Sequence, residues 1–288
     1  NQGGILGIVG ETGSGKSVLA QSILNLTSPG VIESGSIRYK GEDILTMPPA
    51  RQRNMRGKDI SLIFPDPATC FDPLFTIGDQ IVETIQTHEK VGKREAKEKA
   101  VHLLELVGIP SPQRRIDEYP FQFSGGMIQR AMIAAAISSN PELIVADNPT
   151  QALDVTIQAQ IIELLFELKE RLGTTIVFIS HNLGVVSQIV QDVMVLYSGR
   201  MVEYGAKDKV LREAEHPYTR ALIESVPAIS GPRAGKLKTI PGQRGNGRGT
   251  GCIFKSRCPV AAAECEQPPV FREIASEHHV ACWQAANE

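Results

Sequence analysis

The sequence lacks the features that mark several specialised classes of protein. No apolar run approaches the about 20 residues that span a bilayer, and the longest candidate, Met132–Ile137, is far shorter. Neither sign of charge dominates, because the formal net charge is only −2. Such a charge provides no long-range attraction to nucleic acid or anionic lipid. We therefore expect no nucleic-acid partner.

A secretory signal is also missing at the N-terminus. The chain begins "NQGGILGIVG", with neither a basic segment nor a cleavage site and without a starting Met. We expect further sequence upstream of Asn1. With 42% hydrophobic and 22% charged residues, the composition is that of an ordinary globular protein with one large domain or two smaller ones.

Segments of strand and helix character alternate along the chain. Short apolar runs bounded by turn residues predict strands, and apolar residues at three- and four-residue spacing predict helices. The alternation predicts an α/β fold with a mainly parallel core sheet, an antiparallel β subdomain and a helical subdomain inserted at about 69–140. The expected strands are 4–10, 59–64, 142–147 and 174–180, the expected hairpins are 35–44 and 193–205, and the expected helices are 16–26, 155–172 and several within 77–140.

The composition changes after about Pro227. The stretch "GPRAGKLKTIPGQRGNGRGTG" is rich in Gly and basic residues, which is typical of a linker or loop. Four cysteines follow it. We predict one large domain over residues 1–226 and a small Cys-rich extension over residues 227–288.

The stretch "GETGSGKS" (Gly10–Ser17) matches the phosphate-binding pattern G-x-x-x-x-G-K-[ST], between an expected strand and an expected helix. Glycines let backbone N–H groups turn toward phosphate oxygens, and the helix start adds a positive dipole end. An accidental Gly-rich turn is the alternative, which the full match in this context disfavours. The residues predicted to bind ATP here are Gly10, Gly13, Ser14, Gly15, Lys16 and Ser17, with Lys16 on the β- and γ-phosphates and Ser17 on Mg²⁺.

Asp147 ends the apolar run "ELIVAD" and would supply a second Mg²⁺-side ligand. Taken alone, an Asp after a strand is more often a turn residue. The phosphate-binding loop reverses that preference.

A second helix start suited to anions lies at "FSGGMIQR", where Ser124-Gly125-Gly126 opens an expected helix. One nucleotide does not need two such ends from one chain, but two chains arranged head-to-tail do. The stretch "ALD" ends at Asp154, and "FISHN" places His181 after the next strand. Outside this setting, Asp154 would be read as a helix N-cap and His181 as a surface histidine.

Together these motifs resemble the ATPase subunits of ABC transporters, over the chain from Gly4 to about Val226. The resemblance implies the P-loop fold of ABC ATPases and the cofactors ATP and Mg²⁺. By the same resemblance, the Walker A loop is Gly10–Ser17, the Walker B aspartate is Asp147, the signature is Ser124-Gly125-Gly126, the D-loop residue is Asp154 and the switch histidine is His181. The adenine-stacking aromatic residue of the family would lie upstream of Gly4.

The stretch "HPYTRAL" (His216–Leu222) and the tail "GCIFKSRCPVAAAECEQPP" resemble the oligopeptide/dipeptide/nickel importer branch of that family. This implies an ATP-binding subunit on the cytoplasmic face of the cell membrane. Its implied partners are a second, different ATPase chain in a heterodimer, two transmembrane permeases and an extracytoplasmic solute-binding protein. The implied cargo is a di- or oligopeptide or a related small solute.

Three positions depart from the family pattern. Asn148 stands at the position of the catalytic glutamate, Pro65 at the position of the Q-loop glutamine, and Asn182 where an aspartate usually follows the switch histidine. An amide cannot take a proton at neutral pH, and Pro lacks both a side-chain amide and a backbone N–H. We therefore hypothesise that this chain's own site hydrolyses ATP slowly, while its signature completes the partner's site. An engineered change at residue 148 is an alternative.

The tail holds Cys252, Cys258, Cys265 and Cys282 in the pattern C-x5-C-x6-C-x16-C, without the C-x2-C pairs of common zinc modules. Four thiolates suit Zn²⁺ or a [4Fe–4S] cluster, and the spacing does not separate them. The resemblance to peptide-importer ATPases favours the cluster. Cys70 is expected to be unliganded. A soluble ABC ATPase with an iron–sulfur module, unrelated to transport, is the alternative function.

Overall fold

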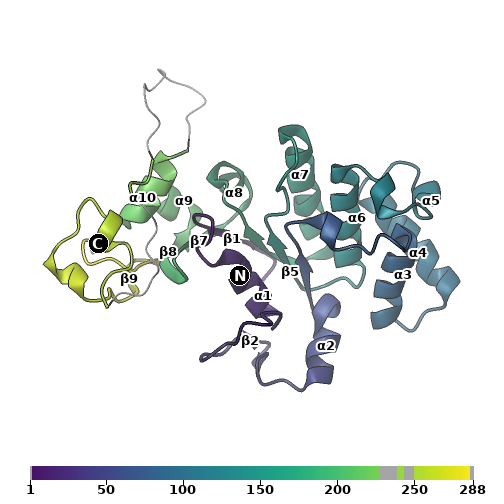
Figure 1. Ribbon diagram of the computed structural model, residues 1–288, viewed down its shortest axis with the longest axis horizontal. Helices are drawn as coiled ribbons and strands as arrows, with labels where there is room; N and C mark the ends of the chain where they lie inside the picture. The colour runs from purple at the N-terminus through teal and green to yellow at the C-terminus, as the bar shows by residue number, and fades with distance from the viewer. Residues whose placement is uncertain (1, 227–238, 243–249, 286–288) are drawn as a thin grey trace. The chain divides into compact units, whose positions relative to one another are not determined.

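The computed structural model describes residues 2–226, 239–242 and 250–285. The chain forms two compact units, Asn1–Gly4 with Val18–Val177, and Ile5–Ser17 with Phe178–Glu288. Figure 1 labels many of their helices and strands. The predicted boundary between residues 226 and 227 falls within the second unit, and its functional meaning stays a prediction.

The strands of the first unit carry the expected buried apolar runs. β4 (Ile60–Ile63) pairs in parallel with β5 (Leu143–Asp147), with Ile60 opposite Leu143 and Ile63 opposite Ala146. β6 (Thr175–Ile179) follows β5 in the strand order. A two-stranded antiparallel ribbon forms from β2 (Arg38–Tyr39) and β3 (Glu42–Asp43), as the turn residues there predict.

The expected helices within 77–140 form in the first unit, where α3 and α4 pack side by side and α4 contacts α6 (Figure 1). One face of α3 places Ile77, Ile81 and Ile85 in the core, each fully buried. Residues four apart share a helix face, and each such burial stabilises the fold by roughly 1.5–3 kcal/mol. The helices that begin and end here are α2 (Pro49–Lys58), α3 (Ile77–His88), α4 (Lys93–Leu106), α5 (Pro112–Arg115), α6 (Gly125–Ile137) and α7 (Val155–Leu172), with 3₁₀ turns η1 (Pro67–Thr69) and η2 (Pro120–Gln122).

Helix α2 is not among the predicted elements. Its sequence, "PARQRNMRGK", buries only Met55 and therefore has no apolar stripe to recognise. Gly57, at φ 83°, interrupts it near its end. A Cβ at Gly57 would lie 2.8 Å from His88 Nε2, so the close approach of α3 also requires glycine there.

The second unit is built on β1 (Ile5–Val9), which pairs in parallel with β7 (Asp192–Tyr197). β7 then pairs antiparallel with β8 (Arg200–Ala206) through the predicted turn at Ser198-Gly199. Both turn residues have positive φ, 45° and 81°, as a tight hairpin turn requires. The helices of this unit are α8 (Leu183–Ile189), α9 (Lys207–Arg212) and α10 (Pro217–Glu224). Helix α1 (Lys16–Ile23) has its first two residues in this unit and the others in the first unit.

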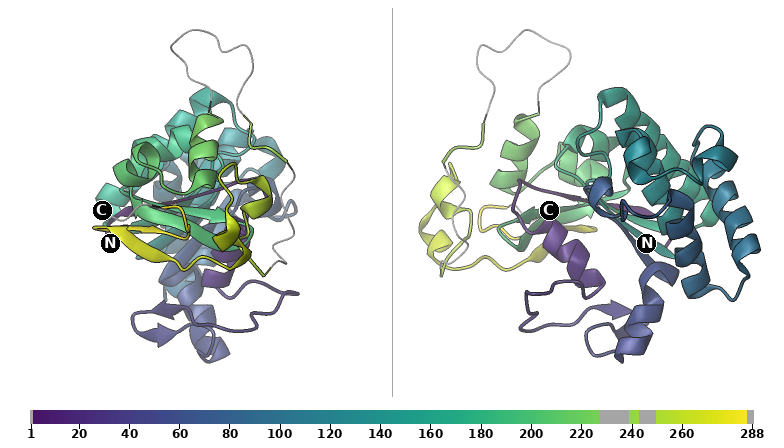
Figure 2. Two further views of the ribbon diagram at one scale, coloured as in Figure 1. Left: turned by 90° about the vertical axis from the view of Figure 1, so that its left-hand side faces the viewer. Right: turned by 45° about the vertical axis from the view of Figure 1, so that its right-hand side comes forward.

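The Cys-rich tail contributes strands that the sequence did not predict. β10 (His278–Val280) pairs antiparallel with β8, and β9 (Arg272–Ala275) pairs antiparallel with β10. Both views of Figure 2 show this yellow segment beside the green β8. The tail also contains the 3₁₀ turns η3 (Lys255–Arg257) and η4 (Ala263–Glu266). The sheet of this unit is mixed, because the predicted β7–β8 hairpin and the two tail strands add antiparallel pairs to the parallel β1–β7 pair.

Across residues 2–226, 239–242 and 250–285, none of the helices has the length and apolar character needed to traverse a bilayer.

Candidate nucleotide-binding site

The predicted phosphate loop lies in the second unit, between the end of β1 and the start of α1. Gly10, Gly13 and Gly15 all have positive φ, at 150°, 77° and 105°. A Cβ at Gly10 would lie 2.2 Å from the carbonyl oxygen of Leu196, so only glycine fits where the loop passes β7. The Gly199 N–H donates to the carbonyl of Ser14 at 2.8 Å and ties the loop to the β7–β8 turn.

The Lys16 ammonium group is held over the loop itself. Its Nζ donates to the carbonyl oxygens of Gly10 at 2.7 Å and Glu11 at 3.0 Å, and to Ser14 Oγ at 3.4 Å. Lys16 is 5% exposed and Ser14 is fully buried. A buried cation among backbone N–H groups at a helix start is suited to bind the phosphate groups of a nucleotide.

In the first unit, Asp147 ends β5 and is 3% exposed. The next residue, Asn148, has a φ of 46°, a left-handed conformation that Asn tolerates better than most residues. Its Nδ2 donates to Asp147 Oδ1 at 2.9 Å. A carboxylate such as Asp147 is a preferred Mg²⁺ ligand, whereas the amide beside it cannot act as a general base.

The Ser124-Gly125-Gly126 segment begins α6 as predicted. Ser124 Oγ accepts from the Met127 N–H at 3.3 Å and caps the helix, and both Ser124 and Gly125 are exposed. A Cβ at Gly126 would lie 3.0 Å from Ile157 Cγ2, so the small residue also allows α6 to approach α7. The exposed helix start leaves backbone N–H groups accessible to an anion.

Asp154 caps α7, with its Oδ1 accepting from the Ile157 N–H at 3.0 Å. The N-cap prediction is confirmed, and Gly173 ends the helix at φ 64° as expected. The first unit thus brings the signature segment close to the start of α7, because a Cβ at Gly125 would lie 3.7 Å from Leu153 Cδ2.

His181 lies in the second unit and is exposed. Asn182, one of the three departures, caps α8 by accepting from the N–H groups of Gly184 at 3.0 Å and Val185 at 3.4 Å. Asn and Asp are about equally good caps. The helix therefore tolerates this departure without structural cost.

Two matches with known families cover most of the chain. The ABC transporter profile matches residues 1–151, and the profile of the oligopeptide/dipeptide transporter C-terminal region matches residues 202–265. The chain belongs to the ATP-binding subunits of the oligopeptide/dipeptide ABC transporter family.

Individual relatives agree with this assignment. The chain is 47% identical over 288 residues to the "Probable peptide ABC transporter ATP-binding protein y4tR" of Sinorhizobium fredii, over 98% of this chain and 86% of the relative. It is 42% identical over 289 residues to the oligopeptide transport ATP-binding protein OppD of Bacillus subtilis, over 98% of this chain and 80% of the relative. Among solved structures, the ATP-binding cassette MJ0796, a dimer bound to ADP and Pi, is similar with a TM-score of 0.64 and 25% identity, over 72% of this chain and 87% of that chain.

In this ABC subunit, Pro65, at the predicted position of the Q-loop glutamine, lies in the loop that follows β4. Pro65 is partly buried there, and Asp66 caps the turn η1 by accepting from the Ala68 N–H at 3.1 Å. Cys70 is a free, exposed thiol whose Sγ donates to the Asp66 carbonyl at 3.3 Å. A glutamine amide is therefore absent from this position of the chain.

The expected metal centre of the ABC subunit's tail is not supported. All five cysteines are free, and in the described parts of the chain no group of three or more His, Cys, Asp or Glu side chains is arranged to hold a metal ion. Burial raises the pKa of Cys252, Cys258 and Cys282, and the neighbouring thiols act in the same direction. As placed, the described side chains of the tail therefore form no ligand set for a [4Fe–4S] cluster or Zn²⁺.

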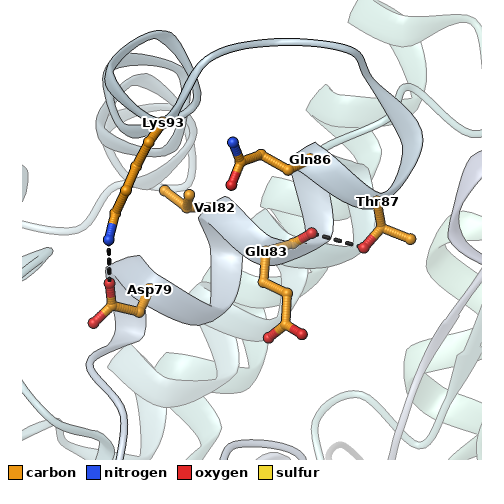
Figure 3. Close-up of a pocket in the computed structure, with 6 residues that line it drawn as sticks. All are labelled: Asp79, Val82, Glu83, Gln86, Thr87 and Lys93. Atoms are coloured by element: carbon orange, nitrogen blue, oxygen red, sulfur yellow. Dashed lines mark hydrogen bonds and ion pairs between the residues drawn. The ribbon is translucent and has the colours of Figure 1, made fainter.

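A surface pocket of about 300 Å³ lies beside α3 and the start of α4, and none of the residues that line it is predicted to bind nucleotide (Figure 3). Lys93 Nζ lies 3.8 Å from Asp79 Oδ1, and Thr87 Oγ1 donates to the Glu83 carbonyl at 2.8 Å. These are ordinary contacts of exposed helix surfaces. The residues that line the pocket are Asp79, Val82, Glu83, Gln86, Thr87 and Lys93.

The "HPYTRAL" segment of the subunit forms the start of α10. His216 is 1% exposed, and its Nδ1 accepts from the Tyr218 N–H at 3.0 Å, so it is a helix N-cap. Burial lowers the pKa of His216 to about 4, although the Glu203 carboxylate acts in the opposite direction. The imidazole is therefore neutral in the folded protein near pH 7.

Acidification is expected to destabilise the subunit through His216. The unfolded histidine takes up a proton near pH 6.5, whereas the folded one stays neutral until about pH 4. The stabilising contribution is complete above pH 6.5 and is lost as the pH falls toward 4, in total about 3 kcal/mol. Urea unfolding between pH 7 and 4 measures it. His216→Asn keeps a capping oxygen without a titrating group, so a parallel loss of stability in both proteins would contradict the assignment.

Proposed function

We propose that this ABC subunit serves an importer of di- or oligopeptides or related small solutes and couples ATP binding and hydrolysis to their uptake. The observation that carries the proposal is the match of residues 202–265 to the oligopeptide/dipeptide transporter C-terminal region. The names of the two relatives, which refer to peptide and oligopeptide transport, support the proposal. The alternative of a soluble ABC ATPase with an iron–sulfur module has no supporting observation in the described part of the tail, residues 239–242 and 250–285.

The proposed roles of the site residues follow the family motifs. Backbone groups of the phosphate loop and Lys16 hold the phosphates, while Ser17 and Asp147 bind Mg²⁺. His181 contacts the γ-phosphate. The residues assigned to nucleotide in this way are Gly10, Gly13, Ser14, Gly15, Lys16, Ser17, Asp147 and His181, with Ser124, Gly125, Gly126 and Asp154 directed to the partner chain.

Lys16→Met is expected to weaken the binding of Mg·ATP to the isolated chain by about 10- to 100-fold. A hydrogen bond from a charged group contributes about 1.5–3 kcal/mol, and each 1.4 kcal/mol is tenfold in affinity. Isothermal titration with Mg·ATP measures the loss. Lys93→Met, which removes a lysine 79% exposed at its side chain on α4, is the matched control and should bind like the wild type. Equal affinities of all three proteins would refute the assignment of the loop.

We further propose that the chain works as one asymmetric half of an ATPase pair. Its own site is impaired by Asn148 and Pro65, while its intact signature completes the site of a second, different ATPase chain. Removing the Walker B glutamate in the partner alone should therefore abolish most turnover of the reconstituted complex. Substantial remaining activity, or full turnover by homodimers of this chain, would contradict the asymmetric pair.

The proposed complex also contains two transmembrane permeases and an extracytoplasmic solute-binding protein, with this subunit on the cytoplasmic face of the cell membrane. Vesicles reconstituted with the complex should accumulate labelled di- or oligopeptides when ATP is supplied on the side of the ATPases. Uptake of another solute with no response to peptides would overturn the peptide assignment and leave the ATP-binding role intact. Residues 227–288 are proposed to be a regulatory extension.

A further inference from the structure

Arg257, in the Cys-rich tail, reaches the phosphate loop of the same unit. Its guanidinium donates to both carboxylate oxygens of Glu11, at 2.7 and 3.0 Å, across 246 residues of sequence. It also donates to the carbonyls of Pro241 at 2.8 Å and Ile240 at 3.4 Å, and to Tyr197 Oη at 3.4 Å. The Arg257 side chain is 4% exposed and that of Glu11 27%. A buried, bidentate pair of this kind orients both partners.

Glu11 is held through its backbone as well as its side chain. Its N–H donates to Tyr218 Oη at 2.7 Å, and its carbonyl accepts from Lys16 Nζ at 3.0 Å and from the Ser14 N–H at 3.0 Å. Tyr218 belongs to the "HPYTRAL" segment and Arg257 to the tail, so both segments form hydrogen bonds with Glu11 of the loop. The Glu11 carbonyl thereby also positions Lys16, the lysine predicted to bind phosphate.

An aromatic cluster holds Arg257 and Tyr218 in place. Tyr197, Tyr218 and Phe254 are at most 1% exposed, with ring centroids 4.6–5.4 Å apart. The Arg257 guanidinium lies 5.8 Å from the Tyr197 ring centroid and 6.0 Å from that of Phe254. Stacking and burial leave Arg257 little freedom to move away from Glu11.

We infer that Arg257 and Tyr218 are positioning residues for the phosphate loop, and that through Arg257 the C-terminal extension sets the nucleotide affinity of this chain. The inference rests on the proposed ATP site. A loop without this support samples other conformations, and the apparent dissociation constant rises by the inverse of the competent fraction. A partner that displaced the tail would weaken nucleotide binding in the same way. Glu11 and Arg257 are not recognisable from the sequence, because Glu11 occupies a variable position of the loop motif.

The test uses the full chain with Arg257→Met, Glu11→Gln and the double variant. Amide hydrogen exchange over residues 10–17, measured without nucleotide, should speed up about tenfold in each, and the Kd for Mg·ATP should rise about tenfold. The double variant should be no worse than either single one, because all three break the same pair. Arg257→Lys keeps the charge but not the bidentate geometry, so it should fall between the wild type and Arg257→Met.

Lys255→Met is the matched control. Lys255 forms an ion pair with Glu266 at the surface of the same tail, and among the described residues it has no hydrogen bond to the phosphate loop. It should change neither readout. Unchanged exchange in the Arg257→Met loop, or additive effects in the double variant, would overturn the inference. A wild type that binds no Mg·ATP would instead refute the proposed function, since the exchange readout needs no nucleotide. Loss of the far-UV circular dichroism of the fold in Arg257→Met, with Arg257→Lys indistinguishable from the wild type in both readouts, would show a merely structural role and also overturn it.

Discussion

Replacing Asn148 by Glu is expected to raise ATP hydrolysis at this chain's own site by about 10²- to 10⁴-fold, in a complex whose partner lacks its Walker B glutamate. The amide follows Asp147 directly and donates to its Oδ1 at 2.9 Å, where a carboxylate could polarise the attacking water. Glu at the φ of 46° found here costs about 1–3 kcal/mol of strain. The rate increase itself corresponds to a barrier lowered by about 3–5.5 kcal/mol.

Asn148→Gln is the matched control, because it lengthens the side chain without providing a base, and its rate should equal that of the wild type. Adding Pro65→Gln to Asn148→Glu should raise the rate further if the Q-loop amide also limits the site. Single-turnover hydrolysis of Mg·ATP measures all four proteins. If the wild-type chain already hydrolyses ATP as fast as the Glu variant, the impaired-site proposal is wrong.

Replacing Glu203 by Ala is expected to destabilise the fold by about 3–5 kcal/mol. Glu203 lies on β8 and is fully buried. Its Oε1 lies 2.8 Å from His278 Nε2 and accepts from the Glu215 N–H at 2.8 Å, while Oε2 accepts from the His216 N–H at 3.1 Å. The change leaves these donors buried without acceptors, and each unsatisfied group costs about 1–3 kcal/mol.

Urea unfolding at pH 7 measures the loss. Glu273→Ala is a suitable control, because Glu273 is exposed on β9. Among the described residues, its carboxylate accepts one hydrogen bond from the backbone, from the Glu277 N–H at 3.0 Å. That variant should lose less than about 1 kcal/mol. Since His278 begins β10, Glu203→Ala should also speed amide exchange in 278–280. A loss in Glu203→Ala no larger than that of the control would disprove the role of this buried cluster.

Local chemistry made several elements predictable. The turn at Ser198-Gly199, the Asp154 cap and the Gly173 end of α7 each depend on residues only a few positions apart. Buried strands such as β5 are equally legible, because nearly every side chain in them is apolar. Helix α2 was missed for the opposite reason, since it offers no apolar stripe and is held by its surroundings.

The tail was the least predictable part of the chain. Its cysteine spacing suggested a metal centre, but spacing says nothing of where the thiols point, and the described tail does not bring them into a ligand set. The strands β9 and β10 are short and become strands only because β8 offers an edge to pair with. They extend the antiparallel pairing that the predicted β7–β8 hairpin had already begun.

The sequence by itself determined the family and predicted the phosphate loop and the signature segment, because these depend on short motifs whose backbone chemistry is local. The absence of a proton acceptor at Asn148 is equally a property of the sequence. Only the tertiary structure decided that Arg257 meets Glu11 and that Glu203 meets His278. Such pairs join residues far apart in the chain, and they form only when the packing of the whole unit brings the two side chains together.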